Sequence, residues 1–211
     1  MEDEPSGGGR SVVNLYRETP VAQDIASQGK NIRPALTLRR ATLDDAGILL
    51  AHRRAMFAVN CDDTDAIHRT MTDYAPWLWE RLSTGEYLGW LVVQRGTNGE
   101  IPAASAGLWL IDWPPTPRNL KGKLPYIMSV YTDPAYRRLG LAKQLTTTIL
   151  DTCREEGYPF AFLHTSAEGR SLYDALGFHP STEMMIDLTS AASEQTAALD
   201  RITSLHAALS A

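Results

Sequence analysis

Residues 126–143 read YIMSVYTDPAYRRLGLAK, and this stretch decides the fold. Its first part, residues 126–132, is mainly aromatic, β-branched or apolar, which is typical of a strand buried on both faces. Pro134 ends the strand, because proline donates no hydrogen bond and moves the preceding residue out of helical space. From Leu141 onward, apolar residues recur at positions 145, 149 and 153, and Gly157 follows, which predicts a helix with a left-handed cap.

The turn between this strand and helix contains Gly140 and Ala142, small residues that let another group approach the backbone closely. The first turn of a helix presents amide hydrogens without internal partners and a partial positive charge, so it attracts anions. Although the chain has a net charge of −5, residues 118–143 contain six basic residues and one acid, Asp133. The stretch therefore predicts a phosphate or pyrophosphate site. The alternative is that the small residues only allow close packing of helix on sheet, with the arginines solvated.

Several motifs resemble the GNAT family of N-acetyltransferases. Pro134 and the pattern Arg137-x-x-Gly140-x-Ala142 are similar to its acetyl-CoA signature, and LYDALGF at 172–178 is similar to its closing helix motif. Order, spacing and flanking strands are similar from about Leu36 to Leu188. The resemblance implies an α/β (α+β) GNAT fold, with a mixed central β-sheet of about six to seven strands and helices on both faces.

The resemblance also implies how acetyl-CoA binds as co-substrate. In GNAT proteins the amides of the glycine loop hold the pyrophosphate, and the preceding strand splays from its neighbour so that the pantetheine arm lies between them. The cofactor-binding residues implied are Val130, Tyr131, Thr132, Arg137, Arg138, Leu139, Gly140, Leu141, Ala142 and Lys143. A backbone amide at Val130 or Tyr131 would stabilise the oxyanion.

Tyr173 is the implied general acid, because GNAT proteins commonly place a tyrosine at this position of the motif, near the thioester sulfur. A phenol with a pKa of about 10 is a plausible acid towards a thiolate. The alternative is a buried core tyrosine whose hydroxyl is merely satisfied.

The expected acceptor is a primary amine of a small molecule or peptide, acetylated directly, because no Ser-His-Asp or Cys-His arrangement is legible. Residues 60–83 are rich in acids and tryptophans, which would suit a cationic amine; alternatively, these acids cap helices and turns and the tryptophans are core. The general base stays open among a water chain and the side chains of Glu86, His164, Asp62, Asp63 and Asp65. The alternative functions are a peptide or protein lysine acetyltransferase, a non-catalytic acyl-CoA-binding sensor, and an unrelated phosphate-binding fold.

The remaining elements follow from periodicity and turn residues. A hairpin is predicted from two apolar runs joined by a turn that contains Asn98-Gly99. The expected elements are a strand at 36–39, helices at 42–57 and about 74–83, the hairpin strands at 87–94 and 101–110, a short strand at 158–164, a short helix ending at Gly177, and a last strand at 184–188.

The bulk composition indicates one ordinary globular domain, since 44% of the 211 residues are hydrophobic and 21% are charged. We place this domain at 35–189, after a disordered extension at 1–34 and before a tail or appended helix at 190–211.

The same numbers exclude several classes of partner. No apolar run approaches the roughly 20 residues of a membrane span, and the acidic N-terminus is unlike a signal peptide, so we expect a cytoplasmic protein without a membrane partner. The acidic balance argues against nucleic-acid binding. Cys61 and Cys153 are too few and too far apart for a disulfide framework or a metal cluster, so we expect no metal. The family resemblance is compatible with a homodimer.

Overall fold

The computed structural model describes residues 35–59 and 61–186. The expectations for residues 1–34, 187–188 and 190–211 lie outside these residues. A boundary between Leu172 and Tyr173 divides the chain into two compact units.

The first unit contains a five-stranded sheet with the order β1-β2-β3-β4-β5. The strands are β1 (Leu36–Arg40), β2 (Tyr87–Gly96), β3 (Gly99–Asp112), β4 (Lys123–Thr132) and β5 (Phe162–Leu163). Neighbouring strands are antiparallel except β4 and β5, which are parallel. The predicted mixed sheet is confirmed, and so is the hairpin, whose turn is closed by Gly96 opposite Gly99.

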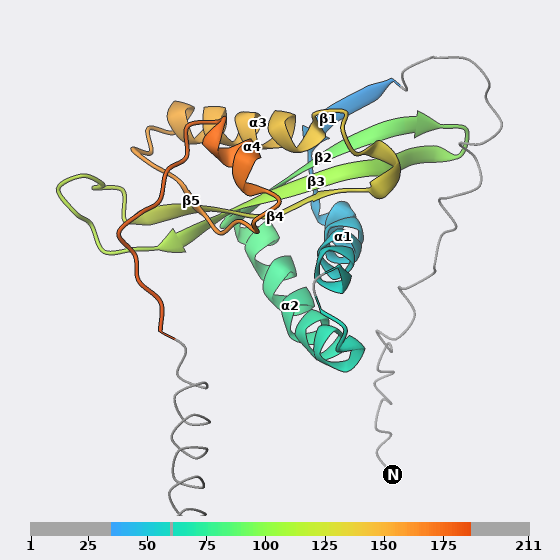
Figure 1. The fold of residues 1–211 in the computed structure, drawn as a ribbon, viewed down its shortest axis with the longest axis horizontal. Helices are drawn as coiled ribbons and strands as arrows, with labels where there is room; N and C mark the ends of the chain where they lie inside the picture. The colour runs from blue at the N-terminus through green and yellow to red at the C-terminus, as the bar shows by residue number, and fades with distance from the viewer. Residues whose placement is uncertain (1–34, 60, 187–211) are drawn as a thin grey trace, which may run out of the picture. The chain divides into compact units, whose positions relative to one another are not determined.

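Helices cover both faces of this sheet, as predicted (Figure 1). A 3-10 turn, η2 (Leu43–Asp45), leads into α1 (Ala46–Ala58), which packs with α2 (Thr64–Thr84) on one face. On the other face lies α3 (Leu141–Glu155), reached through a 3-10 turn, η3 (Pro134–Tyr136). The short α4 (Arg170–Asp174) crosses the boundary between the two units.

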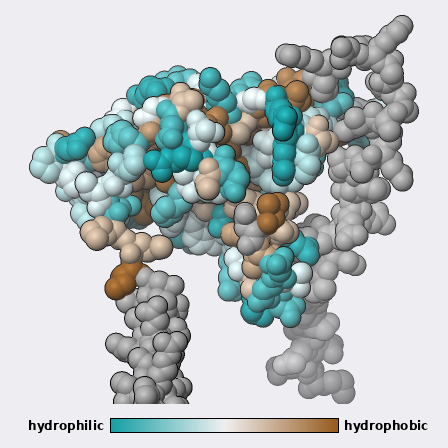
Figure 2. All heavy atoms as spheres, viewed as in Figure 1, coloured by the Kyte–Doolittle hydropathy of each residue, from teal (hydrophilic) through white to brown (hydrophobic). Residues whose placement is uncertain are grey.

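The core follows the predicted apolar stripes. In α3 the buried side chains Leu141, Leu145, Ile149 and Cys153 recur four residues apart and face the sheet. Figure 2 shows that the outer surface of α3 is largely hydrophilic. Under α1 and α2 a second cluster of buried side chains joins helices and sheet; its members are Leu49, Leu50, Ile67, Met71, Leu78, Tyr87, Leu91 and Val93.

An ion-pair network fixes β1 to the start of α1. The guanidinium of Arg39 donates to both carboxylate oxygens of Asp45, each at 2.8 Å, and to Glu100 at 2.7 Å. The same Asp45 carboxylate accepts from the backbone N–H of Thr42 at 2.8 Å, which closes the first turn as a capping box. Arg39 lowers the pKa of Asp45 to about 2.

Several sequence expectations need correction. The helix expected at about 74–83 is only the C-terminal half of α2, which begins at Thr64, has Asp63 as its N-cap and contains Pro76 in its interior. The strand expected at 158–164 is paired only at Phe162–Leu163. The described part of the expected strand at 184–188 is not extended in a sheet, and Met184 is 98% exposed, so the described residues hold five strands rather than six to seven.

The expectation that residues 126–132 are buried on both faces was also wrong. In β4 only Leu124, Pro125 and Ile127 are fully buried, and the rest of the strand is half-buried. The physical reason is that β5 pairs with β4 only at Tyr126 and Ile127, so no strand of the described residues lies beside the later part of β4 on that edge.

None of the helices in the described residues is both long enough and apolar enough to cross a membrane.

Candidate active site

The turn between β4 and α3 is fixed by hydrogen bonds at its start and borders open space at Gly140. The Asp133 carboxylate accepts from the N–H of Ala135 at 2.9 Å, and the buried Tyr136 donates its hydroxyl proton to Gln94 at 2.8 Å. Two residues then take left-handed backbone, Arg138 with φ of 64° and Gly140 with φ of 79°. This path leaves the backbone N–H groups of residues 138–143 without a hydrogen-bond acceptor among the residues that the structure describes.

The space above this turn is free, and its charge is positive. A Cβ placed on Gly140 would meet no atom within 4 Å. Arg137, Arg138 and Lys143 are exposed, and none of them forms an ion pair with a described residue. The remaining predicted residues differ in exposure: Leu139 is 45% exposed, Ala142 is half-buried, and Leu141 is buried and anchors the helix to the sheet. Unpaired amides and cations around open space can hold a diphosphate.

The edge of β4 beside this turn carries the other predicted cofactor residues. Val130, Tyr131 and Thr132 follow the point at which β4 loses β5 as a neighbour. A β-bulge precedes them, because the pairing with β3 passes from Met128 opposite Gly107 to Tyr131 opposite Ser105. Ser129 lies in this bulge with a φ of 54°. A strand edge without a partner leaves backbone donors and acceptors available to an extended ligand.

A polar group of four side chains, the bulge cluster, lies on the α1 and α2 side of this bulge. Its members are Arg53, Tyr74, Tyr87 and Ser129. The Arg53 Nη1 donates to the Ser129 Oγ at 2.7 Å, and its guanidinium lies 4.1 Å from the centre of the Tyr74 ring. The phenols of Tyr74 and Tyr87 complete the cluster, and burial raises the pKa of both.

Next to this cluster a half-buried histidine, His52, contacts β3 and β4. The His52 Nδ1 lies 2.9 Å from the Ser105 Oγ, and its ring centre is 4.7 Å from that of Tyr131. Burial lowers the pKa of His52 to about 4, so the imidazole is neutral at neutral pH. Sequence reasoning assigned no role to His52, Arg53 or Ser129. The bulge that brings them together depends on pairing with β3, which no local pattern reports.

The candidate bases are scattered. Glu86 lies 3.9 Å from both Arg81 and Lys123, between two cations at the start of β2. His164 hydrogen-bonds through Nδ1 with the Tyr126 hydroxyl, where β4 and β5 part. The aspartates Asp62, Asp63 and Asp65 are exposed at the start of α2.

Two residues of the acidic and aromatic stretch at 60–83, Asp63 and Trp77, have structural roles. The Asp63 carboxylate accepts from the N–H of Ala66 at 2.8 Å and so caps α2. Trp77 packs edge-on against Trp109 with ring centres 4.9 Å apart, whereas Trp79 is 51% exposed.

Tyr173 opens the second unit. Its carbonyl accepts from the N–H groups of Leu176 and Phe178, and its ring centre lies 5.8 Å from that of Phe178. The phenol is buried, and burial raises its pKa above the ordinary value.

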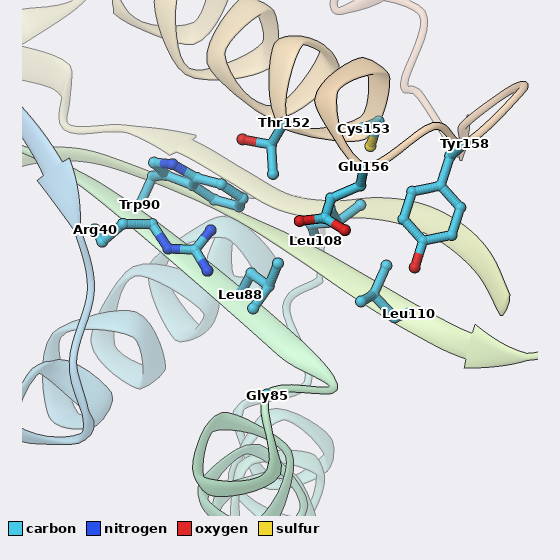
Figure 3. A pocket seen from close by; sticks show the side chains of 10 residues that line it. All are labelled: Arg40, Gly85, Leu88, Trp90, Leu108, Leu110, Thr152, Cys153, Glu156 and Tyr158. Atoms are coloured by element: carbon cyan, nitrogen blue, oxygen red, sulfur yellow. The ribbon is translucent and has the colours of Figure 1, made fainter. Parts of the chain in front are cut away.

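A separate cavity of about 530 Å³ lies between the sheet and the C-terminal end of α3 (Figure 3). Its wall carries Arg40, whose guanidinium lies 4.2 Å from the centre of the Trp90 ring. Glu156 and Tyr158 contribute polar groups on the opposite side. None of the predicted site residues lines this cavity, which is therefore distinct from the Gly140 turn.

Comparison with known proteins gives one family. The model of the acetyltransferase (GNAT) family matches residues 54–178. A GCN5-related N-acetyltransferase from Ralstonia eutropha JMP134 is 32% identical, with 73% of this chain and 99% of that chain covered and a TM-score of 0.66. A predicted acetyltransferase from Clostridium acetobutylicum, solved with acetyl-CoA, is 23% identical, with 74% and 97% covered and a TM-score of 0.62.

A more distant likeness is to glucosamine-6-phosphate N-acetyltransferase from Arabidopsis thaliana, at 20% identity, with 72% and 97% covered and a TM-score of 0.51. It concerns the fold alone. No curated protein gives a match.

Proposed function

Since the chain belongs to the GNAT acetyltransferase family and is an acetyl-CoA-dependent N-acetyltransferase, we propose that it moves the acetyl group directly to a primary amine of a small molecule or peptide. The neutral amine attacks the thioester carbonyl and forms a tetrahedral oxyanion. The carbon–sulfur bond then breaks, the amine nitrogen loses a proton, and the thiolate of coenzyme A gains one.

One observation carries this proposal: the amides of residues 138–143 have no acceptor among the described residues, and exposed cations surround them beside open space. We assign the pyrophosphate of acetyl-CoA to these amides. Arg137, Arg138 and Lys143 would supply full charges to the same diphosphate. Leu139, Gly140, Leu141 and Ala142 would contribute backbone groups rather than side chains, which fits the mixture of exposed and buried side chains among them.

The unpaired edge of β4 suits the pantetheine arm. An extended ligand beside Val130, Tyr131 and Thr132 could exchange backbone hydrogen bonds with the strand in place of the missing neighbour. The thioester would then reach the bulge, where an amide of Val130 or Tyr131 would stabilise the oxyanion.

We assign the proton for the leaving thiolate to Tyr173. Burial raises the pKa of its phenol, so the hydroxyl keeps its proton at neutral pH and can donate it. We expect Tyr173→Phe to lower kcat by about 100-fold while the Kd for acetyl-CoA stays unchanged. Tyr158→Phe is the matched control, because Tyr158 lines the separate cavity. Unchanged turnover in Tyr173→Phe would refute the assignment.

The experiment for the reaction itself is a thiol-release assay with acetyl-CoA across amino acids, polyamines, aminoglycosides and lysine peptides, joined to calorimetry with acetyl-CoA and ATP. Release that depends on an amine supports the proposal. Binding of acetyl-CoA without transfer to any amine would favour an acyl-CoA sensor instead, and preference for ATP would contradict the cofactor assignment.

A further inference from the structure

We propose that Arg53 is a carboxylate-binding residue and that the acceptor amine is therefore an amino acid, with its carboxylate held at the bulge cluster. This inference rests on the proposed function and names the substrate class for the same site. It differs from the expectation of a purely cationic amine, which was based on the acidic residues near the start of α2.

The first argument is the state of the Arg53 guanidinium. This group has five N–H donors, yet the only hydrogen bond it makes to a described residue is from Nη1 to the Ser129 Oγ. Its Nε is buried without a partner, and no carboxylate of a described residue lies within ion-pair distance. A donor left without a partner is costly, so this guanidinium calls for an acceptor, which can reach it only through the nitrogens that are not buried.

The second argument is that this cation is held in one orientation. Its guanidinium carbon lies 4.1 Å from the centre of the Tyr74 ring and 4.9 Å from that of Phe57. Together with the bond to Ser129, these contacts fix the plane of the fork. A fixed fork recognises a planar carboxylate through two parallel hydrogen bonds at little entropic cost.

The third argument is its location. Ser129, to which Arg53 is bonded, immediately precedes Val130 and Tyr131, whose amides we assign to the oxyanion. Adjacent Cα atoms are about 3.8 Å apart, so we place a carboxylate on Arg53 beside the same stretch of β4 as the reacting carbonyl. An amine one or two carbons from that carboxylate would then be directed towards the carbonyl. An α- or β-amino acid meets this condition, whereas a polyamine or a lysine side chain in a protein offers no such carboxylate.

The surrounding groups favour a carboxylate over a cation or a phosphate. The phenols of Tyr74 and Tyr87 have raised pKa values and so remain neutral, and His52 nearby is neutral as well. Within the bulge cluster the one charged side chain is thus Arg53, whose single positive charge matches one carboxylate. A phosphate dianion would need a second cation, and the neighbouring Arg54 is exposed on α1.

The test compares each of the twenty amino acids and β-alanine with its own carboxamide, in the thiol-release assay. The amine of a carboxamide is less basic and hence more often neutral, so a preference for the free acid reports binding rather than reactivity. We expect the preferred amino acid to exceed its carboxamide by about 10- to 100-fold in kcat/KM, the worth of a hydrogen bond to a charged group. We expect Arg53→Gln to abolish that preference through KM and Arg53→Lys to retain part of it.

The control is Arg54→Gln, which removes the same charge from the next, exposed position and should leave the preference intact. The Kd for acetyl-CoA checks that each variant is folded. If the wild-type protein did not bind acetyl-CoA, that result would count against the proposed function rather than against this subsite. Preference for carboxamides, for plain alkylamines or for aminoethyl phosphate would overturn the inference, as would equal losses for acid and amide in Arg53→Gln. Saturation-transfer NMR with the coenzyme A complex compares binding of the amino acid with binding of its carboxamide. Equal binding of the two compounds would also overturn the inference.

Discussion

Gly107→Ala should be among the most damaging small substitutions in this protein, because the Tyr87 ring occupies the place of the missing side chain. A Cβ on Gly107 would lie 2.9 Å from the Tyr87 Cε1 and closer still to its Cζ and hydroxyl. Tyr87 is 2% exposed and belongs to the core under α2, so it has nowhere to move. We expect a loss of about 3 kcal/mol, the upper end for overpacking. In a chain of this size that lowers Tm by about 6 to 12 °C.

The assay is urea unfolding, with the midpoint and slope fitted together. Gly47→Ala is the matched control, since a Cβ there meets nothing within 4 Å and the position is an exposed one in α1, so alanine should stabilise by about 0.5 kcal/mol. In a Tyr87→Leu background the further loss from Gly107→Ala should fall below about 1 kcal/mol, as expected for coupled neighbours. A loss below about 1 kcal/mol in the wild-type background would refute the steric argument.

Two further predictions concern charge and the cofactor turn. Arg39 lowers the pKa of Asp45 from 3.8 to about 2, so the Asp45 carboxylate contributes about 2 kcal/mol to the free energy of unfolding above pH 4 and loses this contribution as the pH falls towards 2. The free energy of unfolding of Asp45→Asn should therefore lack this dependence on pH, and an unchanged pH profile would contradict the prediction. Gly140→Ala should lower stability by about 1 kcal/mol through its left-handed φ and weaken acetyl-CoA binding by about tenfold in calorimetry. Gly122→Ala carries a similar φ of 69° and should lose only stability, so equal Kd values for the two variants would contradict the role of the turn.

The sequence is informative where structure is local. The four-residue spacing from Leu141 to Cys153 predicts both the bounds of α3 and its buried face, and Gly157 does take the left-handed backbone expected of it. The hairpin is equally local, because its turn lies between two apolar runs.

The sequence fails where structure depends on distant partners. The bulge at Ser129 exists because β3 pairs out of step with β4, and the Arg53 that contacts it comes from 76 residues away. The start of α2 at Thr64 is hidden by a polar run and by Pro76, a residue that predicts a helix end but lies inside this helix. The role of Tyr173 stays a prediction from family resemblance.

The short β4–β5 pairing has a consequence for local opening of the sheet. Only Tyr126 opposite Phe162 and Ile127 opposite Leu163 attach β5 to the sheet, whereas β2 and β3 are joined along almost their whole length. Segments held by so few ladder bonds open locally at a small fraction of the global unfolding free energy. The amide hydrogens of β5 should thus exchange with solvent long before those of β2. The β4–β5 pairing, which lies next to the proposed cofactor-binding edge of β4, should therefore open more readily than the β2–β3 pairing.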